Sequence, residues 1–223
     1  MFSLNAPDAA LAQAADAATN EVMKISSYVE RWASSPFGQL SDAPWRITQQ
    51  ASEHVREVMA SLPSEYRRIG DTAVHSTAQI EAGAILKGPV IVGPGCFVAS
   101  SALLRGGVFL EEDCTVGPAV ELKTTLMFRG SKVAHLSFVG DSILGSEVNV
   151  EAGAVIANYR NELDDKTIRI AFGGEVIDTG VEKFGALVGD LSRIGANAVV
   201  APGAILAARC SIRRLTVVDQ YPR

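Results

Sequence analysis

The chain has 223 residues, of which 48% are apolar, and a formal net charge of −5, so it can form one sizeable packed domain with a smaller extension. Its scattered Lys and Arg residues do not form the basic patch that nucleic-acid binding needs, which excludes a nucleic-acid partner. No basic segment precedes a long apolar run at the N-terminus, and no stretch of about 18 uncharged apolar residues occurs, so we expect a cytoplasmic protein without a membrane partner.

Residues 1–68 are predicted to form a helical extension. Apolar residues in Leu11–Trp32 are spaced alternately four and three apart, which predicts an amphipathic helix. Ser41 or Asp42 can cap a second helix, and Pro63 suits its end. Both helices are short and amphipathic, so we expect their apolar stripes to pack on each other, on the main domain or on another subunit.

After Gly70 the apolar period becomes six. The aliphatic series is Val74, Ile80, Leu86, Val92, Val98, Leu104, Leu110, Val116 and Leu122. Small residues stand two positions before each of them, at Thr72, Ala78, Ala84, Val90, Cys96, Ala102, Val108, Cys114 and Val120. A β-sandwich would instead show period-two alternation with turn signals about every 8–12 residues. A hexapeptide repeat is typical of a parallel β-helix, so we predict an all-β main domain of this kind over residues 69–223.

The hexad register breaks twice. The aliphatic series resumes in a shifted phase at Phe138 and later returns to its original phase. Because inserted residues must leave the prism as loops, chemistry is expected at the breaks, and the first brings His135 to a displaced position. The second, residues 158–185, is predicted to be an arm with a hairpin at Gly173-Gly174 that packs on a neighbouring subunit or covers a site.

The chain contains three cysteines, Cys96, Cys114 and Cys210. They are far apart and show no CxxC spacing, so neither a disulfide framework nor a zinc site is predicted. We expect them to be core residues, and we expect no metal in the function.

The segment from Lys132 to Tyr159 reads KVAHLSFVGDSILGSEVNVEAGAVIANY. It resembles the acetyltransferase half of the bifunctional N-acetylglucosamine-1-phosphate uridyltransferase/glucosamine-1-phosphate acetyltransferase family, whose signature reads roughly KAGHLxYxGDxxIGxxVNIGAGTITxNY. Upstream, LLRGG at Arg105 and VELK at Lys123 stand at the family's spacing. The resemblance covers about residues 74–206, implies a left-handed β-helix, and gives the N-terminal helices no counterpart. A Gly-rich LxxGxGTRM-type loop is absent, so we expect no uridyltransferase activity.

The resemblance implies a CoA-dependent acetyl transfer to an amino-sugar phosphate, with acetyl-CoA as co-substrate. His135 would be the general base that takes a proton from the acceptor amine, a task that suits a side chain titrating near neutrality. Arg105 and Lys123 would supply charge-assisted hydrogen bonds to the acceptor phosphate. The other residues that it implies are Phe138, Asn149, Asn158 and Tyr159 for the substrate, and Ala152 and Ala196 for the cofactor.

Several positions depart from the family pattern. Phe138 replaces a tyrosine, Asp164 replaces a lysine with Lys166 two residues on, and Glu151 replaces a glycine. An acid at position 164 would repel a phosphate. These departures leave open a second reading, a sugar-phosphate-binding or regulatory homologue without turnover. Arg214 near the chain end either pairs with CoA phosphates or is a solvated charge.

The predicted β-helix also bears on assembly. A prism of this kind has flat faces and an exposed end. The resembled family forms trimers, so the resemblance implies a homotrimer with one site at each subunit interface.

Overall fold

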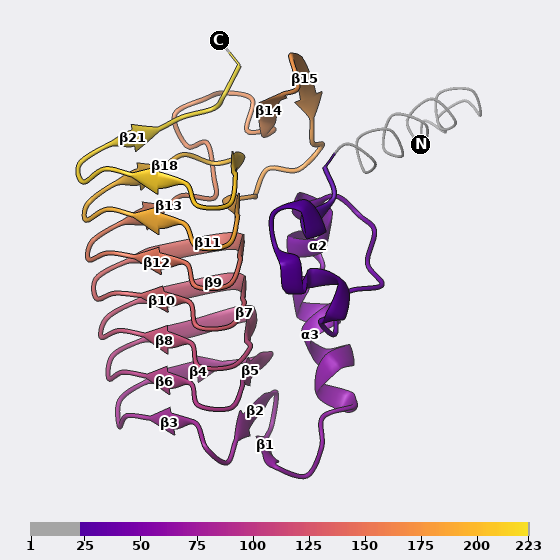
Figure 1. Cartoon of the computed structure of the whole chain (residues 1–223), viewed down its shortest axis with the longest axis vertical. Helices are drawn as coiled ribbons and strands as arrows, with labels where there is room; N and C mark the ends of the chain where they lie inside the picture. Colours follow the sequence, from indigo (N-terminus) through magenta and orange to yellow (C-terminus); the bar gives the residue numbers. More distant parts are fainter. Residues whose placement is uncertain (1–22, 223) are drawn as a thin grey trace.

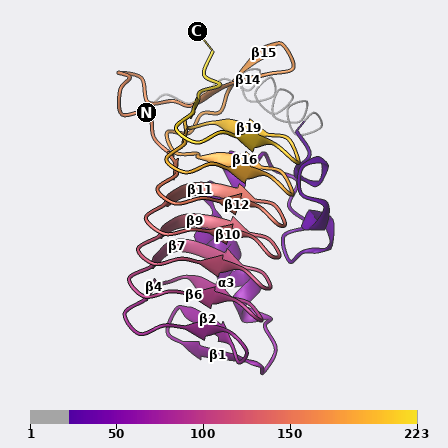
Figure 2. The same cartoon turned by 60° about the vertical axis from the view of Figure 1, so that its left-hand side comes forward.

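The computed structural model describes residues 23–222, and its main body is a left-handed parallel β-helix (Figure 1). Successive coils stack along one axis, and Figure 2 shows the stack from a second side. The pairing between coils is parallel, since Val98 lies opposite Val116 and Val116 lies opposite Val133. The fold predicted from the hexad period is confirmed.

The strands of the β-helix form three faces. Face 1 consists of β4 (Ile85–Lys87), β13 (Val155–Ile156), β18 (Val199–Val200), β21 (Val217–Val218) and the first residues of β7 (Leu103–Leu110), β9 (Glu121–Met127) and β11 (Phe138–Leu144). Face 2 consists of β2 (Thr72–His75), β5 (Val90–Val92), β16 (Ala186–Val188), β19 (Ala204–Leu206) and the last residues of β7, β9 and β11. Face 3 consists of β3 (Gln79–Ile80), β6 (Phe97–Val98), β8 (Thr115–Val116), β10 (Lys132–Val133), β12 (Asn149–Val150), β17 (Arg193–Ile194) and β20 (Ser211–Ile212). An additional strand, β1 (Tyr66–Ile69), pairs antiparallel with β2.

The interior of the prism is filled by the two predicted ladders. Leu104, Leu110 and Val116 of the aliphatic series are fully buried, as are Cys96 and Cys114 of the small-residue series. Both belong to one continuous hydrophobic cluster that runs through the coils. Burial of these side chains supplies the main stabilisation of the fold, at about 25 cal/mol for each Å² of apolar surface removed from water.

The first break in the hexad register is a shortened corner. Between faces 1 and 2, β7 turns through Gly106 and Gly107, whose φ angles are 74° and 97°. The next two coils turn through single residues, Thr124 with a φ of 52° and Asp141 with a φ of 45°, so each loses one residue and the pairing of β7 with β9 shifts register. The prediction that the chain leaves the prism near His135 is wrong, because the break removes residues. We call this the arm corner, since the inserted arm also starts there.

The shortening moves one position of the aliphatic series. Leu122 lies opposite Val139 and Val139 lies opposite Ile156, and all three are fully buried. Phe138, predicted to continue the series, lies opposite Glu121 instead and is half-buried. The core position is therefore corrected to Val139, and the ring of Phe138 faces outward.

The described part of the helical extension begins with two 3₁₀ helices. These are η1 (Ile25–Ser27) and η2 (Glu30–Ser34). The helix predicted over Leu11–Trp32 is therefore wrong in its last part, and its part before Met23 lies outside the described residues. The four-and-three spacing still marks a buried side, because Ile25, Val29 and Trp32 are all buried.

The second predicted helix is divided into α2 (Pro44–Gln49) and α3 (Ala51–Ala60) by Gln50. Neither Ser41 nor Asp42 caps it, because Pro44 takes the first position of α2 and makes Ala43 the cap residue. No helix within residues 23–222 is long and apolar enough to cross a membrane.

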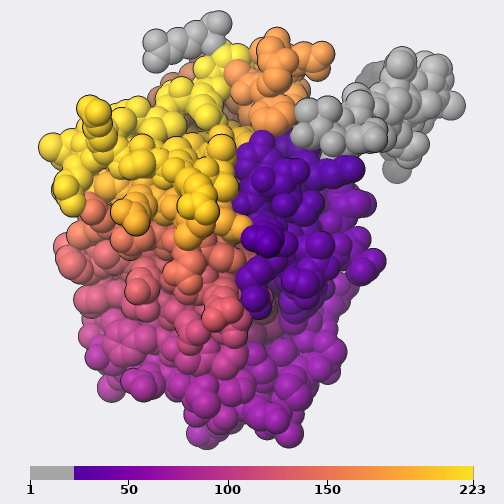
Figure 3. Space-filling model, in the orientation of Figure 1, coloured from indigo at the N-terminus to yellow at the C-terminus, as the bar shows by residue number. Residues whose placement is uncertain are grey.

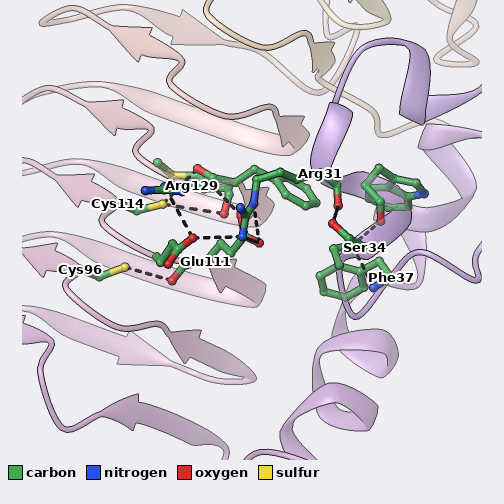
Figure 4. Close-up of polar contacts among 12 residues, drawn as sticks. Arg31, Ser34, Phe37, Cys96, Glu111, Cys114 and Arg129 are labelled. Atoms are coloured by element: carbon green, nitrogen blue, oxygen red, sulfur yellow. Dashed lines mark hydrogen bonds and ion pairs between the residues drawn. The ribbon is translucent and has the colours of Figure 1, made fainter.

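The helical segment, residues 23–62, packs on face 2 of its own β-helix. A second hydrophobic cluster joins Trp32, Phe37 and Ile47 to Phe109 and Leu126 of face 2. Figure 3 shows this segment lying flush against the coils. At the edge of this packing, Arg31 Nε donates to Glu111 Oε2 over 3.1 Å (Figure 4). The apolar stripes of these helices were expected to pack on each other, on the main domain or on another subunit. Packing on the main domain is observed.

The arm between faces 1 and 2 carries the predicted hairpin. β14 (Arg169–Phe172) and β15 (Glu175–Asp178) are antiparallel, and Phe172 lies opposite Glu175 across the two glycines. Ile168 and Ile170 are fully buried in the cluster that holds the helical segment. The arm adds nothing to the interior of the prism, as expected, but its base packs with the helices of the same chain.

Candidate active site

Five of the predicted site residues line one groove. A cavity of about 420 Å³, which we call the acceptor groove, lies where face 1 meets the arm. Its lining consists of Arg105, Lys123, Phe138, Asn158, Tyr159, Glu182 and Lys183. The first five were predicted from separate parts of the sequence, and the fold brings them together.

The β-helix places the two predicted phosphate ligands on neighbouring strands. Arg105 of β7 lies opposite Lys123 of β9, so their cationic side chains stand one above the other, roughly 4.8 Å apart at the backbone. The next position in the ladder is Gly140 of β11. A Cβ atom there would lie 2.7 Å from the Cγ atom of Asn158, so the glycine makes room for that amide.

Acidic side chains hold both cations in place. Arg105 Nη2 lies 2.6 Å from Glu121 Oε1, and both side chains are partly exposed. Lys123 Nζ lies 2.6 Å from Asp141 Oδ2, and here only 18% and 7% of the two side chains are exposed. Asn158 Nδ2 donates to the same oxygen of Asp141. Lys123 is therefore paired with a buried acid, whereas Arg105 is paired with a partly exposed one.

The loop beyond Asn158 places Tyr159 and Lys166 together. The Nζ atom of Lys166 lies 5.7 Å from the centre of the Tyr159 ring and donates to the carbonyl of Asn161 over 2.9 Å. Asp164 is exposed and is not part of the groove lining. The replacement of a family lysine by Asp164 therefore brings no negative charge into the groove wall.

His135 lies at the opposite edge of face 1, in the turn between β10 and β11. Its side chain is exposed, and within residues 23–222 its ring has no hydrogen-bond partner. Gly153 N donates to His135 O over 3.0 Å, and Asn197 N donates to Ala152 O over 3.0 Å. His135, Ala152 and Ala196 therefore occupy equivalent positions in successive coils. We call this edge the histidine corner, and it unites the predicted base with both predicted cofactor residues.

The histidine corner and the acceptor groove border the same face. Phe138, three residues after His135, begins β11 and lines the groove. Three residues of chain span at most roughly 10 Å, so the backbone of His135 lies within that distance of Phe138.

Asn149 is separated from the other predicted binding residues. It lies on face 3, where β12 pairs with β17, and lines a different cavity of about 530 Å³. Arg193, Arg213 and Arg214 contribute to this cavity, so it offers cationic groups beside the histidine corner. Asn149 therefore lies apart from the acceptor groove, beside the predicted cofactor residues Ala152 and Ala196.

Glu151 forms an ion pair across the histidine corner. Its Oε2 atom accepts from Ala196 N over 2.9 Å, and its Oε1 atom accepts from Arg214 Nη2 over 2.7 Å. The amide hydrogen bond and the guanidinium lower the pKa of Glu151. Arg214 is therefore paired with an acid of the same chain, and the backbone donor at Ala196 is already in use.

Comparisons with known proteins find one matching family model and several similar bifunctional proteins. The family model of the GMPPB C-terminal domain matches residues 86–182. A bifunctional sugar-1-phosphate nucleotidylyltransferase/acetyltransferase of Sulfurisphaera tokodaii is 35% identical over 151 residues, which are 68% of this chain and 37% of that protein. The bifunctional protein GlmU of Coxiella burnetii is 36% identical over 135 residues, 60% of this chain and 28% of that protein. The chain is a relative of these bifunctional enzymes.

The resemblance carried by the histidine motif is thereby confirmed. The chain spans little more than a third of the length of the first of these bifunctional enzymes. A solved structure of an Arabidopsis UDP-N-acetylglucosamine acyltransferase is also similar, at 17% identity and a TM-score of 0.37, over 66% of this chain and 61% of that one.

Sequence reasoning missed several residues of the site. Asp141 fixes Lys123 and Asn158 through one buried carboxylate, and the Gly-Asp pair within the motif was a signal for it. Glu182 and Lys183 line the groove from the end of the arm. The hexad pattern does not place either residue, because the arm has no period that relates it to the coils.

Proposed function

We propose that this protein transfers an acetyl group from acetyl-CoA to the amine of an amino-sugar phosphate. One observation carries the proposal: five residues implied by three separate motifs line a single groove on the face whose other edge holds His135. The relative from Sulfurisphaera tokodaii is named a sugar-1-phosphate nucleotidylyltransferase/acetyltransferase, which agrees with an acceptor of this class.

The chemistry assigns one task to each group. Acetyl-CoA supplies the acetyl thioester. An amine is mostly protonated at neutral pH and becomes a nucleophile when a base takes its proton, and His135 is exposed for this task at the other edge of the face that the groove borders. Arg105 and Lys123 donate charge-assisted hydrogen bonds to the phosphate, which orients the amine toward the base.

The residues at the histidine corner fit a cofactor along that edge. Ala152 and Ala196 stack above His135 with small side chains, so the edge is open for an extended group. Arg193 and Arg213 line the cavity next to it and suit the phosphates of CoA. Glu151 must release the amide of Ala196 if that donor is to serve the cofactor.

The same face supports a homotrimer. Outward-facing apolar side chains follow face 1 beside the histidine corner: Ile85, Leu103, Phe138, Val155, Val199 and Val217. Ile85 is 56% and Val217 68% exposed in the single chain. Apolar rows of this kind are covered in stable assemblies, and the helices already occupy face 2. We therefore propose that neighbouring subunits meet at face 1 and complete the groove.

A thiol-release assay tests the activity. The full chain is mixed with acetyl-CoA and a panel of amino sugars and amino-sugar 1-phosphates, and wild type is compared with His135→Ala. Loss of a general base lowers kcat by about 10²- to 10⁴-fold. Lys132→Ala, an exposed change just before the same turn, is the matched control and leaves kcat unchanged. Equal rates for wild type and His135→Ala would contradict the proposed base.

A second function, acceptor binding without turnover, is favoured by the Glu151–Arg214 pair. This pair occupies the donor at Ala196 where a cofactor would lie. Calorimetric titration separates the two functions, because a binding protein takes up the amino-sugar phosphate but releases no thiol. Replacement of Glu151 by glycine, the residue of the family pattern, would then be expected to increase CoA binding.

A further inference from the structure

We propose that the helical segment completes the acceptor site, and that Gln49 and Ser52 bind a hydroxylated ring that the acceptor carries on the far side of its phosphate. The inference rests on the proposed function and narrows its substrate class. The acceptor would be an amino sugar linked through phosphate to a second ring, as in a nucleoside-diphosphate amino sugar.

A second cavity lies directly beside the acceptor groove. It measures about 490 Å³, and we call it the helix-side cavity because Gln49 of α2 and Ser52 of α3 form one wall. Lys123, Glu182 and Lys183 line both this cavity and the acceptor groove. A ligand held at these three shared residues therefore has space on both sides.

The charges differ between the two spaces. The acceptor groove is lined by three cations, Arg105, Lys123 and Lys183, and by one acid, Glu182. The helix-side cavity replaces Arg105 with Asp141, so its lining holds two cations and two acids. An anion is favoured in the groove, whereas a neutral polar group is favoured in the helix-side cavity.

The uncharged lining of the helix-side cavity suits a hydroxylated ring. Gln49 offers an amide with donors and an acceptor, and Ser52 and Thr124 offer hydroxyl groups. The cavity has no aromatic side chain among its lining residues, so it contains no surface on which a base could stack. Hydrogen bonds to a ribose or to a second sugar are the interactions that these groups supply.

Glycines at the arm corner let the helical segment approach this closely. A Cβ atom on Gly107 would lie 2.6 Å from Ser52 N and 2.8 Å from the carbonyl carbon of Ala51. A Cβ atom on Gly106 would lie 3.1 Å from Thr124 Oγ1. Both glycines also have positive φ angles, so the β-helix is locally built to receive the start of α3.

The volumes indicate that a sugar phosphate alone would leave space unused. Small-molecule sites measure about 300–1,000 Å³, and each of the two cavities falls within that range separately. An amino-sugar phosphate is accommodated by the acceptor groove, so the neighbouring cavity is available for whatever is attached to the phosphate.

The test compares three acceptors that share one amino sugar: the 1-phosphate, the 1-diphosphate and the uridine-diphosphate form. Initial rates of thiol release are measured with the full chain, for wild type and for Gln49→Ala. We expect the uridine-diphosphate form to have the highest kcat/KM and to lose about 5- to 10-fold in Gln49→Ala, the effect of one lost hydrogen bond. The 1-phosphate and the 1-diphosphate, which lack the second ring, should change by less than about twofold.

Gln50→Ala is the matched control, because Gln50 is the adjacent glutamine, is exposed and lines neither cavity. An equal loss for all three acceptors, or no loss for any, would overturn the inference while leaving the proposed acetyl transfer intact. If no acceptor yields thiol, the acetyl transfer fails, and calorimetric titration with the same acceptors decides the inference. Tighter binding of the uridine-diphosphate form that weakens in Gln49→Ala supports it, and equal affinities overturn it.

Discussion

The two corners that border face 1 differ in how regularly the coils turn and in which side chains they hold. At the histidine corner each coil turns in the same way, so the exposed His135 and the half-buried Ala152 and Ala196 occupy equivalent positions in the coils. At the arm corner the coils differ in length, the arm is inserted, and a buried carboxylate at Asp141 joins Lys123 to Asn158. The regular corner presents the proposed base to solvent, and the irregular corner fixes side chains that line the acceptor groove.

This difference predicts where substitutions affect folding and where they affect chemistry alone. Polar groups buried at the arm corner stabilise the fold only while all partners are present. Exposed groups at the histidine corner contribute little to stability, so they are free to serve catalysis. Substitutions at the two corners should therefore differ in their effect on the free energy of unfolding.

The largest effect is expected for Asp141→Asn at the arm corner. The substitution keeps the shape and the tolerance for a positive φ but leaves the ammonium of Lys123 without its acid in a site that is 18% exposed. Breaking a buried pair in this way lowers the free energy of unfolding by about 3–5 kcal/mol, measured by urea denaturation.

Glu121→Gln serves as the control for that change. It removes the acid that pairs with Arg105, but the two side chains are 33% and 40% exposed, so the loss should stay below about 1 kcal/mol. If both substitutions lower the free energy of unfolding by the same amount, burial of the Lys123–Asp141 pair is not what stabilises the arm corner.

The next effect concerns the base of the arm. Ile170 is fully buried among residues of the helical segment, so Ile170→Ala should lower the free energy of unfolding by about 2–4 kcal/mol. Val176, on the partner strand of the hairpin, is 59% exposed, and Val176→Ala should change the free energy of unfolding by less than about 0.5 kcal/mol. If both substitutions change the free energy of unfolding by a similar, small amount, the base of the arm does not contribute to the stability of the folded chain.

The two corners also explain what the sequence predicts. Leu104, Leu110 and Val116 reveal the prism because every coil repeats the same packing, and the turn at Gly173-Gly174 reveals the hairpin because only glycine favours such angles. The structure of the arm corner is not predicted in this way, because the six-residue period is interrupted there.

The parts that depend on contacts between distant segments could not be predicted. Gln49 of α2 reaches the same cavity as Lys123 only because Gly107 lets α3 approach the corner. The 3₁₀ turns before Ser35 have the spacing of an α-helix, but packing against face 2 overrides the helical propensity. The six-residue period predicts that Phe138 is in the core, because the period alone does not reveal that one corner residue is missing.

A smaller effect on stability is expected at the histidine corner. Leu136, next to His135, is 69% exposed with a φ of 61°, so Leu136→Asn should change the free energy of unfolding by less than about 0.5 kcal/mol. Asparagine tolerates that φ angle better than leucine, so backbone strain would not explain a loss of stability in the variant. Because the histidine corner borders the proposed interface at face 1, we expect a neighbouring subunit to cover Leu136, and sedimentation should show the variant dissociating at higher concentration than wild type. Unchanged sedimentation would place the interface elsewhere.

The smallest effect is a pH-dependent one at Glu151. Because the amide of Ala196 and then Arg214 lower its pKa from the ordinary value of 4.5, the carboxylate stabilises the fold above that value and loses this contribution as the pH falls through the lowered pKa. Wild type should therefore have a slightly higher Tm than Glu151→Gln at pH 7, and the difference should shrink as the pH falls below 4.5. Arg214→Ala removes only the second cause, so it should reduce this pH dependence less than Glu151→Gln does. If Arg214→Ala removes all of it, the ion pair rather than the amide hydrogen bond holds Glu151 against the histidine corner.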